Sequence, residues 1–167
     1  NSVQCQGTWG NAIKVSPYDK NRIFVAGVHF YTYKGQGNGN GQWRKAANSS
    51  KYFGSNDQFV DPQYLHVDHH EIRFDTESET PIMYIGNDGG IAKTTNDFRD
   101  NLVPNYKDIN TGYNTLQFYN FEAVPNGDIT GGAQDNGTWK LLKDGLTGNS
   151  YRRILGGDGF YTEISEL

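Results

Sequence analysis

The sequence predicts an all-β fold built from short antiparallel strands joined by tight turns. Its 167 residues include 21 glycines, 11 tyrosines and nine phenylalanines, and these residue types favour turns and strands. Long runs rich in Ala, Leu, Glu and Lys, which would indicate helices, do not occur. A strand–turn–strand pattern also recurs along the chain, which indicates a repeat architecture.

The first two strands of each copy are apolar runs on either side of a polar turn. They lie at 11–17 and 22–27, at 71–75 and 82–86, and at 121–125 and 128–132, and a further copy begins at 160–165. Aligning the apolar residue before each turn makes Val15, Phe74, Val124 and Ile164 equivalent.

A third and a fourth strand complete each copy. Third strands follow a Gly-rich turn at 29–33, 91–95 and 138–142, and fourth strands are expected near 43–45 and 106–108. Four short antiparallel strands are typical of one β-propeller blade. The prediction is therefore a propeller with blades at 10–60, 64–113 and 115–154 and the first strand of another at 156–167. The alternative is an ordinary β-sandwich whose segments are similar by coincidence.

A blade needs a neighbour on both of its faces. We therefore expect the chain to be an incomplete propeller, a piece of a larger protein. Its expected partners are the remaining blades or, through exposed blade faces, other copies of itself. The absence of an initiator Met and of an apolar leader at residues 1–4 agrees with a processed or excised piece.

Four stretches carry a resemblance to a known family: 67–75, 84–91, 131–138 and 156–161. Together they resemble the BNR/Asp-box propellers related to sortilin-type and xyloglucanase-type propellers. The resemblance implies a secreted or cell-surface protein. The Asp-box pattern S-x-D-x-G-x-x-W is degenerate here, since the nearest match, Thr94–Asn101, has Phe98 for Gly and Asn101 for Trp.

Charge and composition exclude several classes of function. The net charge is −4, the sequence pI is about 5.5 and the basic residues are scattered, so no basic stripe is available for nucleic acid. No apolar run approaches the roughly 20 residues that span a bilayer. The Gly-rich segment 35–41 lacks the Lys-Ser/Thr and the helix of a phosphate loop. We expect no cofactor.

The repeat places two carboxylates at equivalent points. Asp68 and Asp158 each lie six residues before the aligned residue of their copy, where the other copies have Trp9 and Phe118. Both are expected at the start of an innermost strand, and because residues two apart on a strand share a face, His66 and His70 should lie on the same side as Asp68. That face would line the central channel or its mouth.

Three interpretations of these residues compete. Three metal ligands on one straight strand would span about 13 Å, so we expect no metal site. Paired carboxylates could cleave glycosidic bonds at separations of about 5 to 9.5 Å, with Asp68 and Asp158 as catalytic residues. Alternatively, Asp68, His70 and Asp158 hydrogen-bond the backbone of adjacent blades.

The favoured function is a non-catalytic binding or scaffold segment whose ligand is a protein or an extracellular polysaccharide. The ligand-binding residues we expect are His66, His70, Asp88, Asn120 and Asp135. The alternative is a fragment of a xyloglucanase-like or sialidase-like glycoside hydrolase. The resemblance would place a catalytic Asp at position 87, where this chain has Asn87, and an amide cannot act as nucleophile or base. An assembly factor resembling photosynthetic propellers is a third alternative.

Overall fold

The computed structural model describes residues 10–36, 38–49, 61–99, 103–113, 116–144 and 148–165. These residues form twelve strands and, within those ranges, no helix. The all-β prediction is confirmed. The chain divides into two compact units, Asn1–Thr111 and Gly112–Leu167, and each unit is described by itself.

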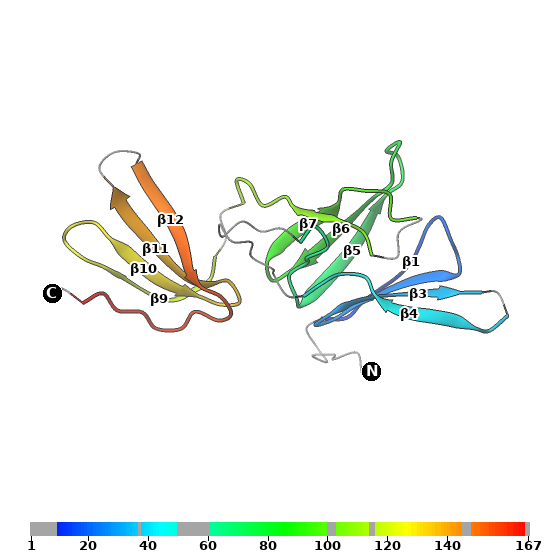
Figure 1. Ribbon diagram of the computed structural model, residues 1–167, viewed down its shortest axis with the longest axis horizontal. Helices are drawn as coiled ribbons and strands as arrows, with labels where there is room; N and C mark the ends of the chain where they lie inside the picture. Colours follow the sequence, from blue (N-terminus) through cyan, green and yellow to red (C-terminus); the bar gives the residue numbers. More distant parts are fainter. Residues whose placement is uncertain are drawn as a thin grey trace. The chain divides into compact units, whose positions relative to one another are not determined.

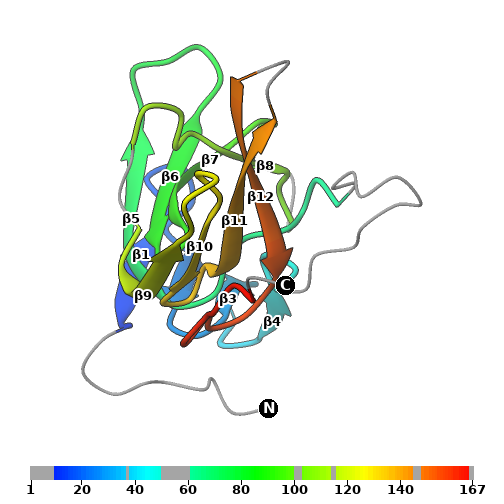
Figure 2. The ribbon, with the colours of Figure 1, turned by 90° about the vertical axis from the view of Figure 1, so that its left-hand side faces the viewer.

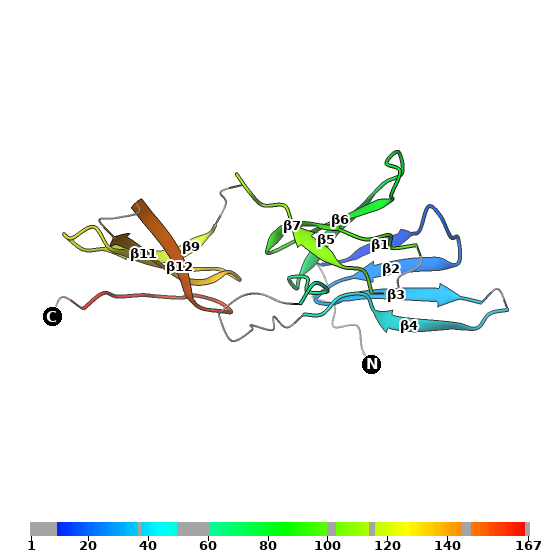
Figure 3. The same ribbon diagram turned by 45° about the horizontal axis from the view of Figure 1, so that its top comes forward.

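The first unit holds two four-stranded antiparallel sheets, each with its strands in chain order (Figures 1 and 3). The first sheet contains β1 (Ala12–Val15), β2 (Arg22–Ala26), β3 (Phe30–Gly35) and β4 (Gly41–Lys45). The second sheet contains β5 (His69–Asp75), β6 (Ile82–Asn87), β7 (Gly90–Thr94) and β8 (Tyr106–Asp108).

The second unit holds the third sheet, again antiparallel and in chain order (Figure 2). Its strands are β9 (Phe118–Ala123), β10 (Ile129–Ala133), β11 (Gly137–Asp144) and β12 (Gly148–Leu155). The predicted unit of four short antiparallel strands is therefore present three times. Residues 160–165, predicted as another first strand, are not assigned to a strand.

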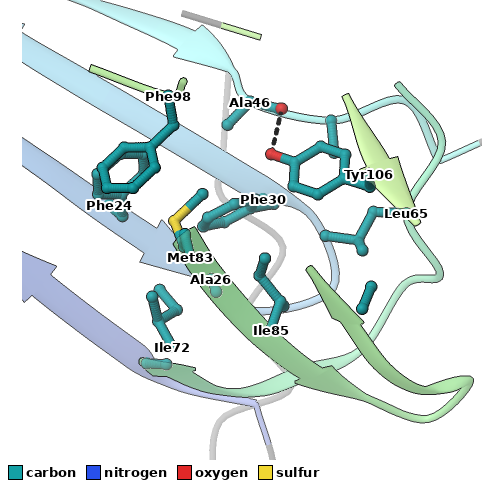
Figure 4. Close-up of a cluster of buried hydrophobic side chains, with 13 residues drawn as sticks. Phe24, Ala26, Phe30, Ala46, Leu65, Ile72, Met83, Ile85, Phe98 and Tyr106 are labelled. Carbon is teal, nitrogen blue, oxygen red and sulfur yellow. Dashed lines mark hydrogen bonds between the residues drawn. The ribbon is translucent and has the colours of Figure 1, made fainter. Parts of the chain in front are cut away.

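An apolar core joins the two sheets of the first unit (Figure 4). Phe24, Ala26 and Phe30 of the first sheet lie in one buried cluster with residues of the second sheet such as Ile72 and Met83. Burial of the larger of these side chains, Phe24, Phe30, Ile72 and Met83, stabilises the fold by about 1.5 to 3 kcal/mol each. The core therefore fixes how the two sheets pack.

Aromatic contacts extend this core. The ring of Phe24 lies 5.8 Å from that of Phe74 and 6.0 Å from that of Phe98, measured between centroids. The hydroxyl of Tyr106 donates to the carbonyl of Ala46 at 2.8 Å (Figure 4). Tyr106 in β8 is thus tied to the residue that follows β4.

One backbone contact occurs in both units. The N–H of His69 donates to the carbonyl of Gly27 at 2.8 Å, and the N–H of Gly159 donates to that of Ala133 at 2.9 Å. Gly27 directly follows β2, and Ala133 ends β10, so both acceptors lie where a second strand meets its hairpin turn. Asp68 and Asp158, which precede the two donors, hold equivalent positions, as the repeat predicted.

The same contact corrects the alignment of the third copy by one residue. With Gly27 opposite Ala133, the pair Ala12–Ala26 corresponds to the pair Asn120–Gly132. Val15 is then equivalent to Ala123 rather than to Val124. The reason is that β9 ends at Ala123, and Val124 already belongs to the turn, where its N–H donates to the carbonyl of Asp128.

Candidate functional site

Five polar residues lie at the end of the first unit that carries the β2–β3 and β6–β7 turns, and we refer to them as the histidine–aspartate cluster. His29 lies between β2 and β3, and Asp88 lies between β6 and β7. The others belong to the segment that enters the second sheet and to the start of β5. The cluster consists of His29, His66, Asp68, His70 and Asp88. Asp68 interacts electrostatically with each of the other four.

Asp68 is not on a strand, contrary to the expectation for residues 66–70. Strand β5 begins at His69 and contains an irregularity between His69 and Glu71. Asp68 itself has a φ of 59°, in the left-handed region that few residues other than Gly, Asn and Asp adopt. The side chains of residues 66–70 therefore do not alternate as they would along a straight strand.

Two hairpins hold Asp68 in this conformation. Its N–H donates to the carbonyl of Val28 at 3.2 Å, and its carbonyl accepts from the N–H of Asp88 at 3.2 Å. The backbone of Asp68 thus bridges the β2–β3 and β6–β7 turns. This bridging fixes the direction in which the side chain of Asp68 leaves the backbone.

The carboxylates of Asp68 and Asp88 lie close together. An oxygen of Asp68 is within 4.8 Å of an oxygen of Asp88. The Oδ1 atom of Asp68 is buried and has no hydrogen-bond partner among the described residues. Burial and then the neighbouring charge of Asp88 raise the pKa of Asp68, because both disfavour the ionised form.

Two histidines, His70 and His66, lie beside this pair of carboxylates. The Nε2 atom of His70 contacts the Oδ1 atom of Asp88. The ring of His66 lies so close to the β6–β7 turn that a Cβ atom added at Gly89 would approach it to 2.7 Å. Gly89 therefore allows His66 to pack against the turn that carries Asp88.

The expectation of no metal site depended on a straight strand, and that premise is wrong. Within the described part of the first unit, however, no group of three or more His, Cys, Asp or Glu side chains lies at metal-binding distance, although Asp68 and Asp88 form a close pair there. Oxygen-binding cations such as Ca²⁺ require six to eight ligands. The two carboxylates would supply only part of such a ligand set.

The expected residues of the second unit have partners inside that unit. The Oδ1 atom of Asp158 accepts from the N–H of Asp135 at 2.9 Å, and Asp135 has a φ of 57°. The Oδ1 atom of Asn120 accepts from the N–H of Thr162 at 3.1 Å. Glu122, also in β9, accepts from the N–H of Ile164 at 2.6 Å. These side chains hold the segment 158–164 against β9 and the β10–β11 turn.

The structure thus brings Asp68 together with Asp88, His66 and His70 within one unit. The expected partner of Asp68 was Asp158, but Asp158 belongs to the other unit. His29 was not expected in the cluster. It lies there because the β2–β3 hairpin accepts the backbone N–H groups of Asp68 and His69, a contact between distant segments that no local sequence signal reveals.

Comparison with known proteins adds no relative: no family model, no curated protein and no solved structure matches this chain. The described residues contain no helix that is long and apolar enough to cross a membrane.

Proposed function

We propose that the chain is a segment of a β-propeller that acts as a non-catalytic binding scaffold, and that its histidine–aspartate cluster binds an extracellular polysaccharide. Three four-stranded sheets in chain order support the propeller. The backbone contact that His69 and Gly159 both make supports it further, because in these two cases the segment that follows a sheet docks on that sheet's second strand in the same way.

The carboxyl group of Asp68 carries the binding proposal. A buried oxygen without a hydrogen-bond partner destabilises the folded chain, and this oxygen belongs to a residue in the left-handed region. Strained, unsatisfied polar groups cluster at binding sites. Sugar hydroxyl groups are donors, and they would satisfy the acceptor atoms of Asp68 and Asp88.

Binding can be tested with the Asp68→Asn variant. Asn adopts the left-handed conformation and keeps the shape of the side chain, but it lacks the charge. We expect Asp68→Asn to weaken binding to the best ligand of a soluble polysaccharide panel by about tenfold or more, as loss of a charged hydrogen bond does. Isothermal titration calorimetry gives the affinity.

Asp108→Asn is the matched control, since Asp108 is an exposed residue of β8 in the same unit. It should bind as the unaltered chain does. Equal affinity of Asp68→Asn and the unaltered chain would overturn the assignment of the site. Binding of a protein and of no polysaccharide would replace the proposed ligand class.

Glycoside hydrolysis is the second candidate function, favoured by one observation. Two carboxylates lie within 4.8 Å of one another, and the pKa of one is raised, as is needed for a general acid beside an ionised nucleophile. In that case Asp68 would be the acid and Asp88 the nucleophile. Release of reducing sugar that both Asp68→Asn and Asp88→Asn abolish would establish it, and binding without release would exclude it.

A further inference from the structure

The first sheet has an open apolar face on the side away from the core. Side chains alternate between the two faces of a strand, and Ala12, Phe24, Ala26 and Phe30 are on the core side. The opposite side carries two cross-strand rows, which we call the outer apolar face: Ile13, Val25 and Tyr31, and Val15, Ile23, Tyr33 and Trp43. The exposed Lys45, opposite Tyr31, ends the first row at the outer strand.

Three members of this face are largely exposed. Ile13 is 66% exposed, Val15 54% and Trp43 55%. The rings of Tyr33 and Trp43 lie 5.2 Å apart, which makes that row continuous to the outer strand. Contiguous apolar surfaces of this kind mark interaction sites.

The second sheet shows what covers such a face. Its pair Phe74–Met83 corresponds in register to Val15–Ile23, and its pair Thr94–Tyr106 corresponds to Tyr33–Trp43. In the second sheet this face is buried: Met83, Thr94 and Tyr106 are each less than a tenth exposed, and Phe74 packs against the core. The outer apolar face is therefore the counterpart of a buried one.

The element that covers this face of the second sheet is the first sheet, which is another copy of the same repeat. The face that contains Phe74 and Met83 packs on the core side of the first sheet, where Phe24 contacts Phe74. The same register on the outer apolar face fits the same kind of cover, a four-stranded sheet. A helix or an extended peptide would cover the outer apolar face less completely, because its two rows run across four strands.

We infer that the outer apolar face binds a sheet of a second copy of this chain. The chain itself supplies sheets of the required type, so the purified protein can form the contact. The inference rests on the repeat architecture in the proposed function and is independent of the ligand at the histidine–aspartate cluster.

Sedimentation velocity over a concentration series tests the inference. We expect the unaltered chain to self-associate, and Trp43→Lys to raise the dissociation constant by at least about tenfold, because it places a charge in an aromatic anchor position. Gln42→Lys is the control, since Gln42 is the exposed neighbour on the same strand with its side chain on the opposite face. It should associate as the unaltered chain does.

Val15→Lys provides a second variant at the other edge of the face, in case Trp43→Lys lowers the far-ultraviolet circular dichroism of the folded chain. A chain that stays monomeric at all concentrations would overturn the inference. So would equal weakening by Val15→Lys and Gln42→Lys. Polysaccharide binding should persist in Val15→Lys, and self-association should persist in Asp68→Asn, so this inference and the binding proposal fail separately.

Discussion

His69 shows how strongly folding alters one side chain. The residue is 2% exposed, and its Nδ1 atom lies 2.8 Å from the carbonyl oxygen of Gly27. Because a carbonyl only accepts, the neutral ring carries its proton on Nδ1. The Nε2 atom is buried without a partner among the described residues. Burial accordingly lowers the pKa of His69 to about 4.

This pKa predicts a loss of stability in mild acid. The unfolded chain takes up the proton near the ordinary pKa of 6.5, whereas the folded chain resists it until about pH 4. The free energy of unfolding should therefore fall from about pH 6.5 to pH 4, by up to about 3 kcal/mol from this group. Urea unfolding at a series of pH values measures the slope.

His69→Gln is the comparison for this slope, because Gln does not titrate. The pKa of His29 is also lowered, chiefly by burial and then by Lys45, so some slope of the same sign should remain. If His69→Gln had the same pH dependence as the unaltered chain, His69 would not be the group responsible.

At this scale the sequence predicted the equivalence of Asp68 and Asp158 but not the surroundings of either. Equivalence follows from the repeat, which is visible in the order of residues. The left-handed backbone at Asp68 and its approach to Asp88 come from hydrogen bonds to two hairpins. Those contacts join segments about 20 and 40 residues away, and no local pattern records them.

At the scale of the elements, Arg22 ties β2 to the connection between β7 and β8. Its guanidinium is buried with the rest of the residue, which is 1% exposed. It donates from Nε to the hydroxyl of Thr32 at 3.2 Å and from Nη1 to the carbonyls of Phe98 and Arg99. The guanidinium also lies 4.8 Å from the ring centroid of Phe24.

Replacement of Arg22 should therefore destabilise the first unit. Arg22→Lys keeps the charge but cannot reproduce the planar set of donors, and buried polar partners would lose their hydrogen bonds. We expect a loss of about 2 to 4 kcal/mol in the free energy of unfolding, measured by urea denaturation. Arg44→Lys, at an exposed residue of β4, should change it by less than about 0.5 kcal/mol. Equal effects of the two substitutions would contradict this assignment.

The strands themselves were largely predictable, and their register was less so. Turn residues and alternating apolar residues placed the strands close to their observed positions. The third copy was misaligned by one residue because Val124 is apolar like Val15, although it lies in the turn. An apolar residue in a turn is indistinguishable from a strand residue when only composition is compared.

At the scale of the whole molecule, the two units differ in their apolar cores. Every member of the large buried cluster lies between Ala12 and Tyr106, within the first unit. In the second unit the buried apolar residues among those described are Ala133 and Leu141. A single four-stranded sheet that leaves Phe118, Phe121 and Leu155 exposed is marginally stable.

We therefore expect the full chain to unfold in two steps, with the second unit unfolding first. A chain shortened to residues 1–111 should keep its β-type circular dichroism spectrum and unfold at the urea concentration of the later step. Fluorescence of Trp139, which belongs to the second unit, should change in the earlier step. One cooperative transition, together with an unfolded 1–111 chain, would contradict the division.

The repeated contact of His69 and Gly159 also gives the chain a direction of assembly. In both copies the donor is the later residue, and the acceptor belongs to a hairpin that is already complete when the donor is added. During synthesis from the N-terminus, each new segment thus meets a finished template close behind it. The repeat is therefore suited to stepwise folding on the ribosome, in the order in which its sheets are made.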